Sequence, residues 1–110
     1  MLCIIKLVID LNMILRTVSQ ERDRIEYMLD RYQRTLTQLP KGSISEKAVS
    51  GKTYYYLKYR DGKKVVSRYL RSMEVDTVRE QLARRKHVEA MIKSLQEEKV
   101  IADKVLEGIE

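Results

Sequence analysis

Two long stretches with a helical spacing of apolar residues frame this chain and constrain its fold more than any other feature. In the first stretch the apolar residues are Ile4, Val8, Leu11, Leu15, Val18, Ile25, Leu29, Tyr32, Leu36 and Leu39, with Arg22 at the one polar seam position. Alternating steps of four and three place these residues along one stripe of a helix, as in a coiled coil. Pro40 and Gly42 then end the helix, because proline lacks an N–H group and glycine accepts non-helical backbone angles. We therefore predict a helix over residues 1–39.

A second stripe of the same kind occupies residues 73–109. Its members are Val78, Leu82, Arg85, Val88, Ile92, Leu95, Lys99, Ala102, Leu106 and Ile109. The step of three from Arg85 to Val88 is a stammer, which locally overwinds a supercoil. We predict that the two helices pair as an antiparallel coiled coil. Arg22 is expected to pair with an acid on the other helix and to help set the register of the pair.

The middle of the chain has a strand-like composition, rich in β-branched and aromatic residues. Its three segments are residues 43–49, 52–60 and 63–71. Ser50-Gly51 and Asp61-Gly62 separate the segments, and Asp-Gly strongly favours a type I′ hairpin turn. The prediction is an α+β fold in one domain of 110 residues: a long N-terminal helix, a three-stranded antiparallel β-meander over residues 43–71 and a long C-terminal helix.

Tight turns would set the register of this meander and so divide its side chains between two faces. We expect Arg60 opposite Lys63 and Tyr54 opposite Tyr69. The face toward the helices would then carry Ile44, Ala48, Tyr55, Leu57, Tyr59, Val66 and Leu70, with Glu46 and Arg68 flanking Tyr55 as a cross-strand ion pair. The opposite face would carry the candidate nucleic-acid-binding residues Lys47, Tyr54, Tyr56, Lys58, Arg60, Lys63 and Tyr69.

Positive charge is concentrated on the meander. Residues 41–71 contain nine Lys or Arg and two acids, a net charge of +7, whereas residues 1–40 carry +1 and residues 72–110 carry −2. A local basic patch attracts polyanions, and aromatic rings among the cations can stack on bases. Nucleic acid is therefore the predicted partner. An acidic protein partner and a merely solvated face, with lysines that discourage edge-strand aggregation, remain alternatives. The basic run at residues 84–87 could extend the phosphate-binding surface along the second helix, or it could form a solvated or interhelical face.

Several classes of protein are disfavoured by what the chain lacks. One Cys and one His leave no disulfide framework and no protein-built zinc site, and they fit a reducing, cytoplasmic setting. No phosphate-cradling glycine loop, nucleophile elbow or cluster of catalytic side chains occurs, so we expect no enzyme and no cofactor.

The apolar N-terminus, MLCIIKLVIDLNMIL, is interrupted by Lys6, Asp10 and Asn12. It therefore falls short of the roughly 18–20 apolar residues of a membrane span, and it lacks the flanks of a secretory signal. We expect a buried helix or an oligomer contact, and residues 1–12 could also be an upstream extension. Apolar residues off the seam, namely Ile5, Leu7, Ile9 and Ile14, predict a homo-oligomer, either a dimer or a larger assembly.

Residues 39–70, LPKGSISEKAVSGKTYYYLKYRDGKKVVSRYL, together with the charged helix that follows, resemble an uncharacterised family of small bacterial and archaeal proteins. The resemblance covers about residues 25–100 and excludes residues 1–12. It implies the helix–meander–helix architecture and no biochemical function. The strands are also loosely similar to the three-stranded DNA-binding domains that precede the catalytic region of tyrosine recombinases, without any recombinase residues.

Three functions fit these features. The leading hypothesis is a nucleic-acid-binding accessory protein that uses the basic, tyrosine-rich sheet face. One alternative is a phage or mobile-element protein that inhibits or adapts a host nucleic-acid enzyme such as a CRISPR nuclease. Another is a structural coiled-coil module for oligomerisation.

Overall fold

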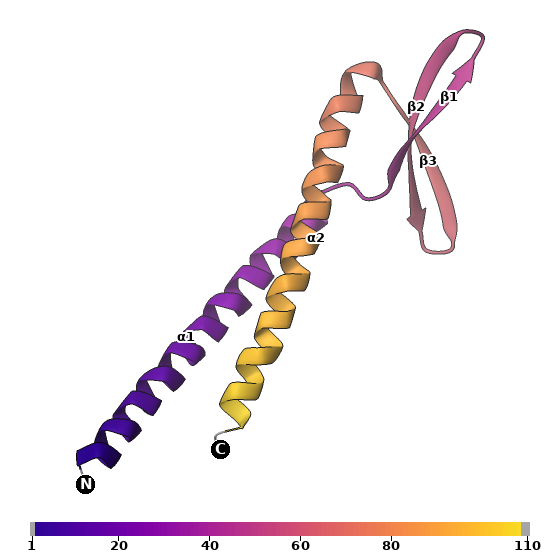
Figure 1. The fold of residues 1–110 in the computed structure, drawn as a ribbon. Coiled ribbons are helices and arrows are strands. Elements are labelled where there is room, and N and C mark those ends of the chain that lie inside the picture. The colour runs from indigo at the N-terminus through magenta and orange to yellow at the C-terminus, as the bar shows by residue number, and fades with distance from the viewer. Residues whose placement is uncertain (1, 109–110) are drawn as a thin grey trace. The chain divides into compact units, whose positions relative to one another are not determined.

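The computed structural model describes residues 2–108. Its elements are α1 (Leu2–Gln38), β1 (Ser43–Val49), β2 (Lys52–Asp61), β3 (Lys64–Leu70) and α2 (Ser72–Glu107) (Figure 1). This confirms the predicted α+β fold of two helices flanking a three-stranded sheet. Ile109, the last member of the second stripe, lies outside the described residues. The chain divides into two compact units, one made of the residues up to Gln33 with those from Ala90 onward, and the other of Arg34–Glu89.

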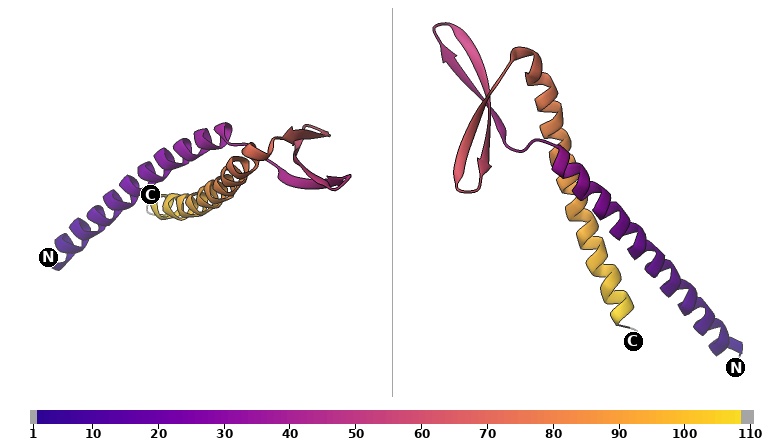
Figure 2. Two further views of the ribbon diagram at one scale, coloured as in Figure 1. Left: turned by 90° about the horizontal axis from the view of Figure 1, so that it is seen from above. Right: turned by 180° about the vertical axis from the view of Figure 1, so that it is seen from behind.

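The first unit is a pair of antiparallel helices, seen from two further sides in Figure 2. Arg22 Nη1 lies 3.7 Å from an Asp103 carboxylate oxygen, and Lys99 Nζ lies 3.8 Å from one of Glu26. From the first ion pair to the second, the residue number rises on α1 from 22 to 26 and falls on α2 from 103 to 99, so the helices run in opposite directions. This pairing is compatible with the predicted coiled coil, and it confirms that Arg22 pairs with an acid of the other helix.

The two predicted stripes supply the core of this helix pair. Burial is nearly complete for Ile25, Ile92, Leu95 and Ala102. Each comes from a seam position, which is the stripe that a partner helix covers in an antiparallel pair. The seam therefore predicts which residues of the two helices are most deeply buried in this pair.

The apolar side chains described in the first turns of α1 are exposed in the single chain, so they are not buried in its own core, and the alternative of an oligomer contact stays a prediction. Seam residues Ile4, Val8 and Leu11 are 66%, 52% and 45% exposed. Of the off-seam residues, Ile5 and Ile14 are also exposed, and the side chains of Leu7 and Ile9 lie outside the described part of the structure. No helix in residues 2–108 combines the length and the apolar composition that crossing a membrane requires.

The second unit contains the β-meander, with β2 between β1 and β3 and both pairs antiparallel. The first hairpin has the predicted register, in which Ile44 lies opposite Leu57 and Ala48 opposite Thr53. Its turn residues Ser50 and Gly51 have φ values of +54° and +79°. Positive φ at both central positions is what a type I′ turn requires, and this turn matches the twist of the strands.

The predicted register of the second hairpin is wrong by two residues. Asp61 lies opposite Lys64 and Tyr56 opposite Tyr69, so that Gly62 and Lys63 form the turn. The predicted register would have placed two cations, Arg60 and Lys63, directly opposite each other, which destabilises a strand pair. The observed register replaces that repulsion with an Asp–Lys pair. Gly62 takes the positive φ (+63°) at the first turn position, as type II′ turns prefer.

A shift of two residues preserves the two faces of the sheet, because side chains alternate with a period of two. Leu57 and Leu70 on the helix-facing side are buried against Val75 and Val78 of α2, and Ile44, Tyr55, Tyr59 and Leu82 pack around them. Ala48, placed on this side by the prediction, is exposed near the end of β1.

The predicted Glu46–Arg68 ion pair is replaced by one to α2. Arg68 lies opposite Leu57 instead of Tyr55 because of the register shift. A Glu46 carboxylate oxygen lies 3.8 Å from Arg79 Nη2, and the same guanidinium lies 5.9 Å from the centre of the Tyr55 ring. These contacts add a polar connection between the sheet and α2.

The loop between α1 and β1 is held by contacts from α2 and β2. Arg85 Nη1 donates hydrogen bonds of 3.0 Å to the carbonyl oxygens of Leu36 and Leu39, and its Nε donates to Glu89. The Leu36 carbonyl also accepts a 3.2 Å hydrogen bond from the backbone N–H of Leu39, so Arg85 gives this oxygen a second donor. The bond to Leu39 supplies a donor to a carbonyl just beyond the end of α1. Gly42, at φ +118°, lies so close to β2 that an added Cβ would overlap the carbonyl oxygen of Lys58.

Candidate nucleic-acid interface

The sheet side that points away from the Leu57–Leu70 core is called the tyrosine face here. It comprises the odd-numbered residues of β1, the even-numbered residues of β2 and the odd-numbered residues of β3. Six of the seven predicted site residues lie on it, namely Lys47, Tyr54, Tyr56, Lys58, Arg60 and Tyr69. The seventh, Lys63, lies in the β2–β3 turn instead of at the start of a strand.

Three tyrosine rings cluster on this face around Tyr69. Tyr69 lies opposite Tyr56, and their ring centres are 5.8 Å apart in an edge-to-face arrangement. The Tyr54 ring is tilted at 51° to the Tyr69 ring, with the centres 6.3 Å apart. Such geometries are favourable for aromatic pairs. Tyr69 is 52% exposed whereas Tyr54 and Tyr56 are half-buried, so Tyr69 offers the largest free ring surface of the three.

Cations surround the tyrosine cluster, and the acids of the meander lie elsewhere. Lys47, Lys58 and Arg60 are exposed. Glu46 projects from the opposite face, and Asp61 closes the second hairpin opposite Lys64. By register neither carboxylate belongs to the tyrosine face, so the strand positions of that face hold cations and no acid.

Lys52 belongs to the same surface and was not among the predicted site residues. It is exposed and lies opposite Val49, the last residue of β1, so it shares a face with Tyr54 and Tyr56. The signal was already present in the sequence, because the predicted turn at Ser50-Gly51 fixes the side to which Lys52 points.

A hollow of about 530 Å³ opens beside Tyr56. Ser45 lies opposite Tyr56 and Ser67 lies opposite Lys58, and these short side chains leave room between their larger neighbours. Glu46 also lines the hollow, but its carboxylate pairs with Arg79. The lining of the hollow therefore combines one tyrosine, two serines, two lysines and this one acid.

The basic run that begins at Arg84 is divided by the fold. Arg84, Lys86 and His87 are exposed on α2, whereas Arg85 is turned toward the end of α1. Arg85 is thus a structural residue and cannot contact phosphate while it makes these bonds. Within residues 2–108 no group of three or more His, Cys, Asp or Glu side chains is placed to hold a metal ion.

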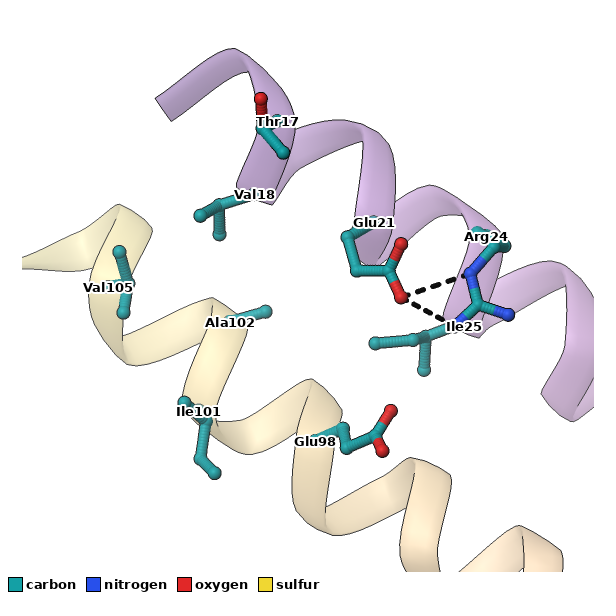
Figure 3. A pocket seen from close by; sticks show the side chains of 9 residues that line it. All are labelled: Thr17, Val18, Glu21, Arg24, Ile25, Glu98, Ile101, Ala102 and Val105. Atoms are coloured by element: carbon teal, nitrogen blue, oxygen red, sulfur yellow. Dashed lines mark hydrogen bonds and ion pairs between the residues drawn. The ribbon is translucent and has the colours of Figure 1, made fainter. Parts of the chain in front are cut away.

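The helix pair carries a groove of different chemistry, shown in Figure 3. It has a volume of about 480 Å³, and its apolar lining residues are Val18, Ile25, Ile101, Ala102 and Val105. Glu21, Arg24 and Glu98 add charge to its lining. Arg24 Nε donates a 3.0 Å hydrogen bond to Glu21, and this bond lowers the pKa of the Glu21 carboxyl. An apolar floor with a charged rim suits contact with another helix better than contact with nucleic acid.

Comparison with known proteins places the chain in a family and leaves its activity open. No curated protein and no solved structure matches the chain significantly. One family model matches residues 18–80, which include most of α1, the whole meander and the start of α2. The model describes a domain of unknown function, in agreement with the resemblance to an uncharacterised family. Because it covers more than half of the sequence, this chain belongs to the family of the domain of unknown function DUF6788.

Proposed function

We propose that the protein is a nucleic-acid-binding accessory protein and that the tyrosine face is its binding surface. The observation that carries the proposal is the gathering of three tyrosine rings and four strand lysines or arginines on one side of a sheet whose two acids lie elsewhere. Cations neutralise phosphates, and aromatic rings stack on bases in a sequence-tolerant way.

The positions of the cations and the rings on the tyrosine face favour different roles for them in binding. Lys47 and Lys52 lie beside Tyr54, toward the first turn, while Lys58 and Arg60 lie toward the second turn. A polyanion that crosses the tyrosine cluster therefore meets positive charge at both ends of its path. Side-chain cations on a sheet position the backbone of the nucleic acid, and the rings contact its bases.

A double substitution tests the proposal. Tyr56→Ala with Arg60→Ala removes one ring and one cation from the tyrosine face. We expect it to weaken binding to mixed DNA and RNA pools by roughly tenfold or more, and to reduce the steepness of the salt dependence by about one phosphate contact. Fluorescence polarisation titrations at two ionic strengths measure both quantities.

The chain offers a matched control for this test. Tyr27 and Arg31 have the same four-residue spacing, lie exposed on α1 and contact each other through a 3.1 Å hydrogen bond. Tyr27→Ala with Arg31→Ala removes the same atoms from α1 instead of the sheet and is expected to leave binding unchanged. Unchanged binding in the Tyr56/Arg60 variant, or an equal loss in the control, would refute the proposed surface.

We further propose that the chain self-associates through the apolar side of the helix pair. The seam of α1 continues with the same spacing to Leu11, Val8 and Ile4, which are exposed, and Ile101 beside the groove is 64% exposed. Residues that repeat the a and d spacing fit another helix with the same repeat, and the helices of a second copy supply one. Burial of these side chains would remove an apolar surface that a monomer exposes to water.

Light scattering tests this self-association. We expect a dimer or a larger assembly at micromolar concentration, and we expect Val8→Ser with Leu11→Ser to shift it toward the monomer. A monomer for the unaltered chain would contradict the proposal. Loss of association without loss of nucleic-acid binding would show that the two surfaces act independently.

A further inference from the structure

We infer that the tyrosine face binds single-stranded nucleic acid and that the hollow beside Tyr56 receives one unpaired base. This inference rests on the proposed function and deepens it, since it names the class of nucleic acid. The observations behind it are the hollow, the exposed ring of Tyr69 and the spacing of the cations along β2.

The hollow has the chemistry that a single base requires. It is lined by one tyrosine, two serines and two lysines, namely Tyr56, Ser45, Ser67, Lys47 and Lys58, together with Glu46, whose carboxylate pairs with Arg79. A serine hydroxyl both donates and accepts hydrogen bonds, so it can contact either kind of group on a base edge. A lysine ammonium group attracts the phosphate attached to the same nucleotide.

Tyr69 provides a second position for a base next to the hollow. Its ring centre is 5.8 Å from that of Tyr56, and half of the side chain is exposed. Because Ser67 and Tyr69 are adjacent on the same face of β3, a strand that puts one base in the hollow can bring the next base over Tyr69. Successive bases on aromatic side chains are a common feature of proteins that bind single strands.

The length of the face fits a short single strand. Arg60 comes eight positions after Lys52 on β2, which at a strand rise of 3.2–3.4 Å per residue is about 26 Å. An extended strand of about four nucleotides covers this length, at the lower end of the site sizes of roughly 4–16 nucleotides known for single-strand-binding folds. The cations at both ends of the cluster would then contact the flanking phosphates.

A duplex uses these features poorly. Its bases are stacked on each other and present only their edges in the grooves, so none of them can enter a hollow or stack on Tyr69 unless it is first flipped out. Unstacking and unpairing a base costs free energy, and a strand that is already unpaired does not incur this cost. Because the cations alone would still attract a duplex, we expect duplex binding to be weaker than single-strand binding but not absent.

The first experiment compares three ligands of one sequence by polarisation at roughly 50 and 200 mM salt. They are single-stranded DNA and single-stranded RNA of about 12 nucleotides, and the DNA duplex of that sequence. We expect at least one single strand to bind about tenfold or more tightly than the duplex. Duplex binding equal to or tighter than both single strands would overturn this inference and leave the proposed function standing. Binding to none of the three would overturn the proposed function itself.

The second experiment tests the hollow directly. Ser67→Leu fills it without changing any charge or ring, and Ser67 is exposed, so the fold should persist, as circular dichroism can verify. We expect a loss of about tenfold in single-strand affinity and no loss for the duplex. Val65→Leu is the matched control, since Val65 lies exposed on the same strand and the same face but outside the hollow. If Ser67→Leu binds single strands as tightly as Val65→Leu does, the hollow is not a base site.

Discussion

Replacement of Arg85 by methionine should destabilise the second unit far more than its place in an exposed basic run suggests. Arg85 fills a seam position of α2, yet its guanidinium donates to the carbonyl oxygens of Leu36 and Leu39 at 3.0 Å each. These bonds join α2 to the end of α1 and to the loop that leads into β1. Met keeps most of the aliphatic stem, so the substitution removes the hydrogen bonds while most of the packing persists.

The expected cost is about 2 kcal/mol of unfolding free energy. A hydrogen bond from a charged donor contributes roughly 1.5–3 kcal/mol. Here both bonds come from one nitrogen atom, and the side chain is 21% exposed, so water can partly replace the lost donor. The loss should therefore be close to that of one such bond and not of two. For a domain near this size it lowers Tm by on the order of 10 °C.

Urea and thermal unfolding followed by circular dichroism measure this cost, and neighbouring Arg84 supplies the control. Arg84 is exposed on the same turn of α2, and Arg84→Met should change the unfolding free energy by less than about 0.5 kcal/mol. Arg85→Lys should fall between the two, because an ammonium group can still reach one carbonyl oxygen but lacks the planar fork of a guanidinium. Equal stability of the Arg84→Met and Arg85→Met variants would refute the capping role of Arg85.

Two further substitutions test the packing of the loop and the seam. Gly42→Ala should cost more than about 1 kcal/mol, because an added Cβ would overlap the Lys58 carbonyl oxygen at a positive φ, whereas Gly62→Ala meets no atom within 4 Å and should cost less; equal losses in chemical denaturation would contradict this. Arg22→Leu should raise the free energy of unfolding by about 1 kcal/mol and with it the midpoint of thermal unfolding. The reason is that Arg22 Nε is buried without a partner among the described residues, while the ion pair of Arg22 with Asp103 is long and partly exposed. A lower midpoint would show that the ion pair stabilises the helix pair after all.

The helices and the first hairpin could be predicted because each depends on residues close together in the sequence. The four-three spacing places Ile25 and Leu95 on buried stripes, and Ser50-Gly51 forms the predicted two-residue turn. The exposure of Val8 and Leu11 could not be read from the same spacing, since a seam predicts which side of a helix is apolar and not how far a partner covers it. The role of Arg85 could not be predicted either, because the carbonyl oxygens that accept its hydrogen bonds belong to residues nearly 50 positions away in the sequence.

The second hairpin shows how an error of register can preserve a predicted surface and still alter its chemistry. Side chains alternate along a strand, so a shift of two residues leaves Tyr56, Lys58 and Tyr69 on the same face, and the sequence alone predicts that face correctly. Adjacency within the face depends on the turn. With Arg60 opposite Lys63, Ser67 would lie opposite Tyr56 and Tyr69 opposite Tyr54.

With the observed turn at Gly62-Lys63, Tyr69 lies opposite Tyr56 and Ser67 lies opposite Lys58. The aromatic cluster thus gathers around Tyr69, while the short serine leaves the hollow between a ring and a cation. Charge composition therefore supports binding to a polyanion in either register, and the turn decides which side chains are neighbours, here Tyr69 beside Tyr56 and Ser67 beside Lys58. A preference for unpaired strands would indicate that this arrangement of rings and serines contributes to binding in addition to charge, whereas equal or tighter binding to duplex would contradict the proposed base site.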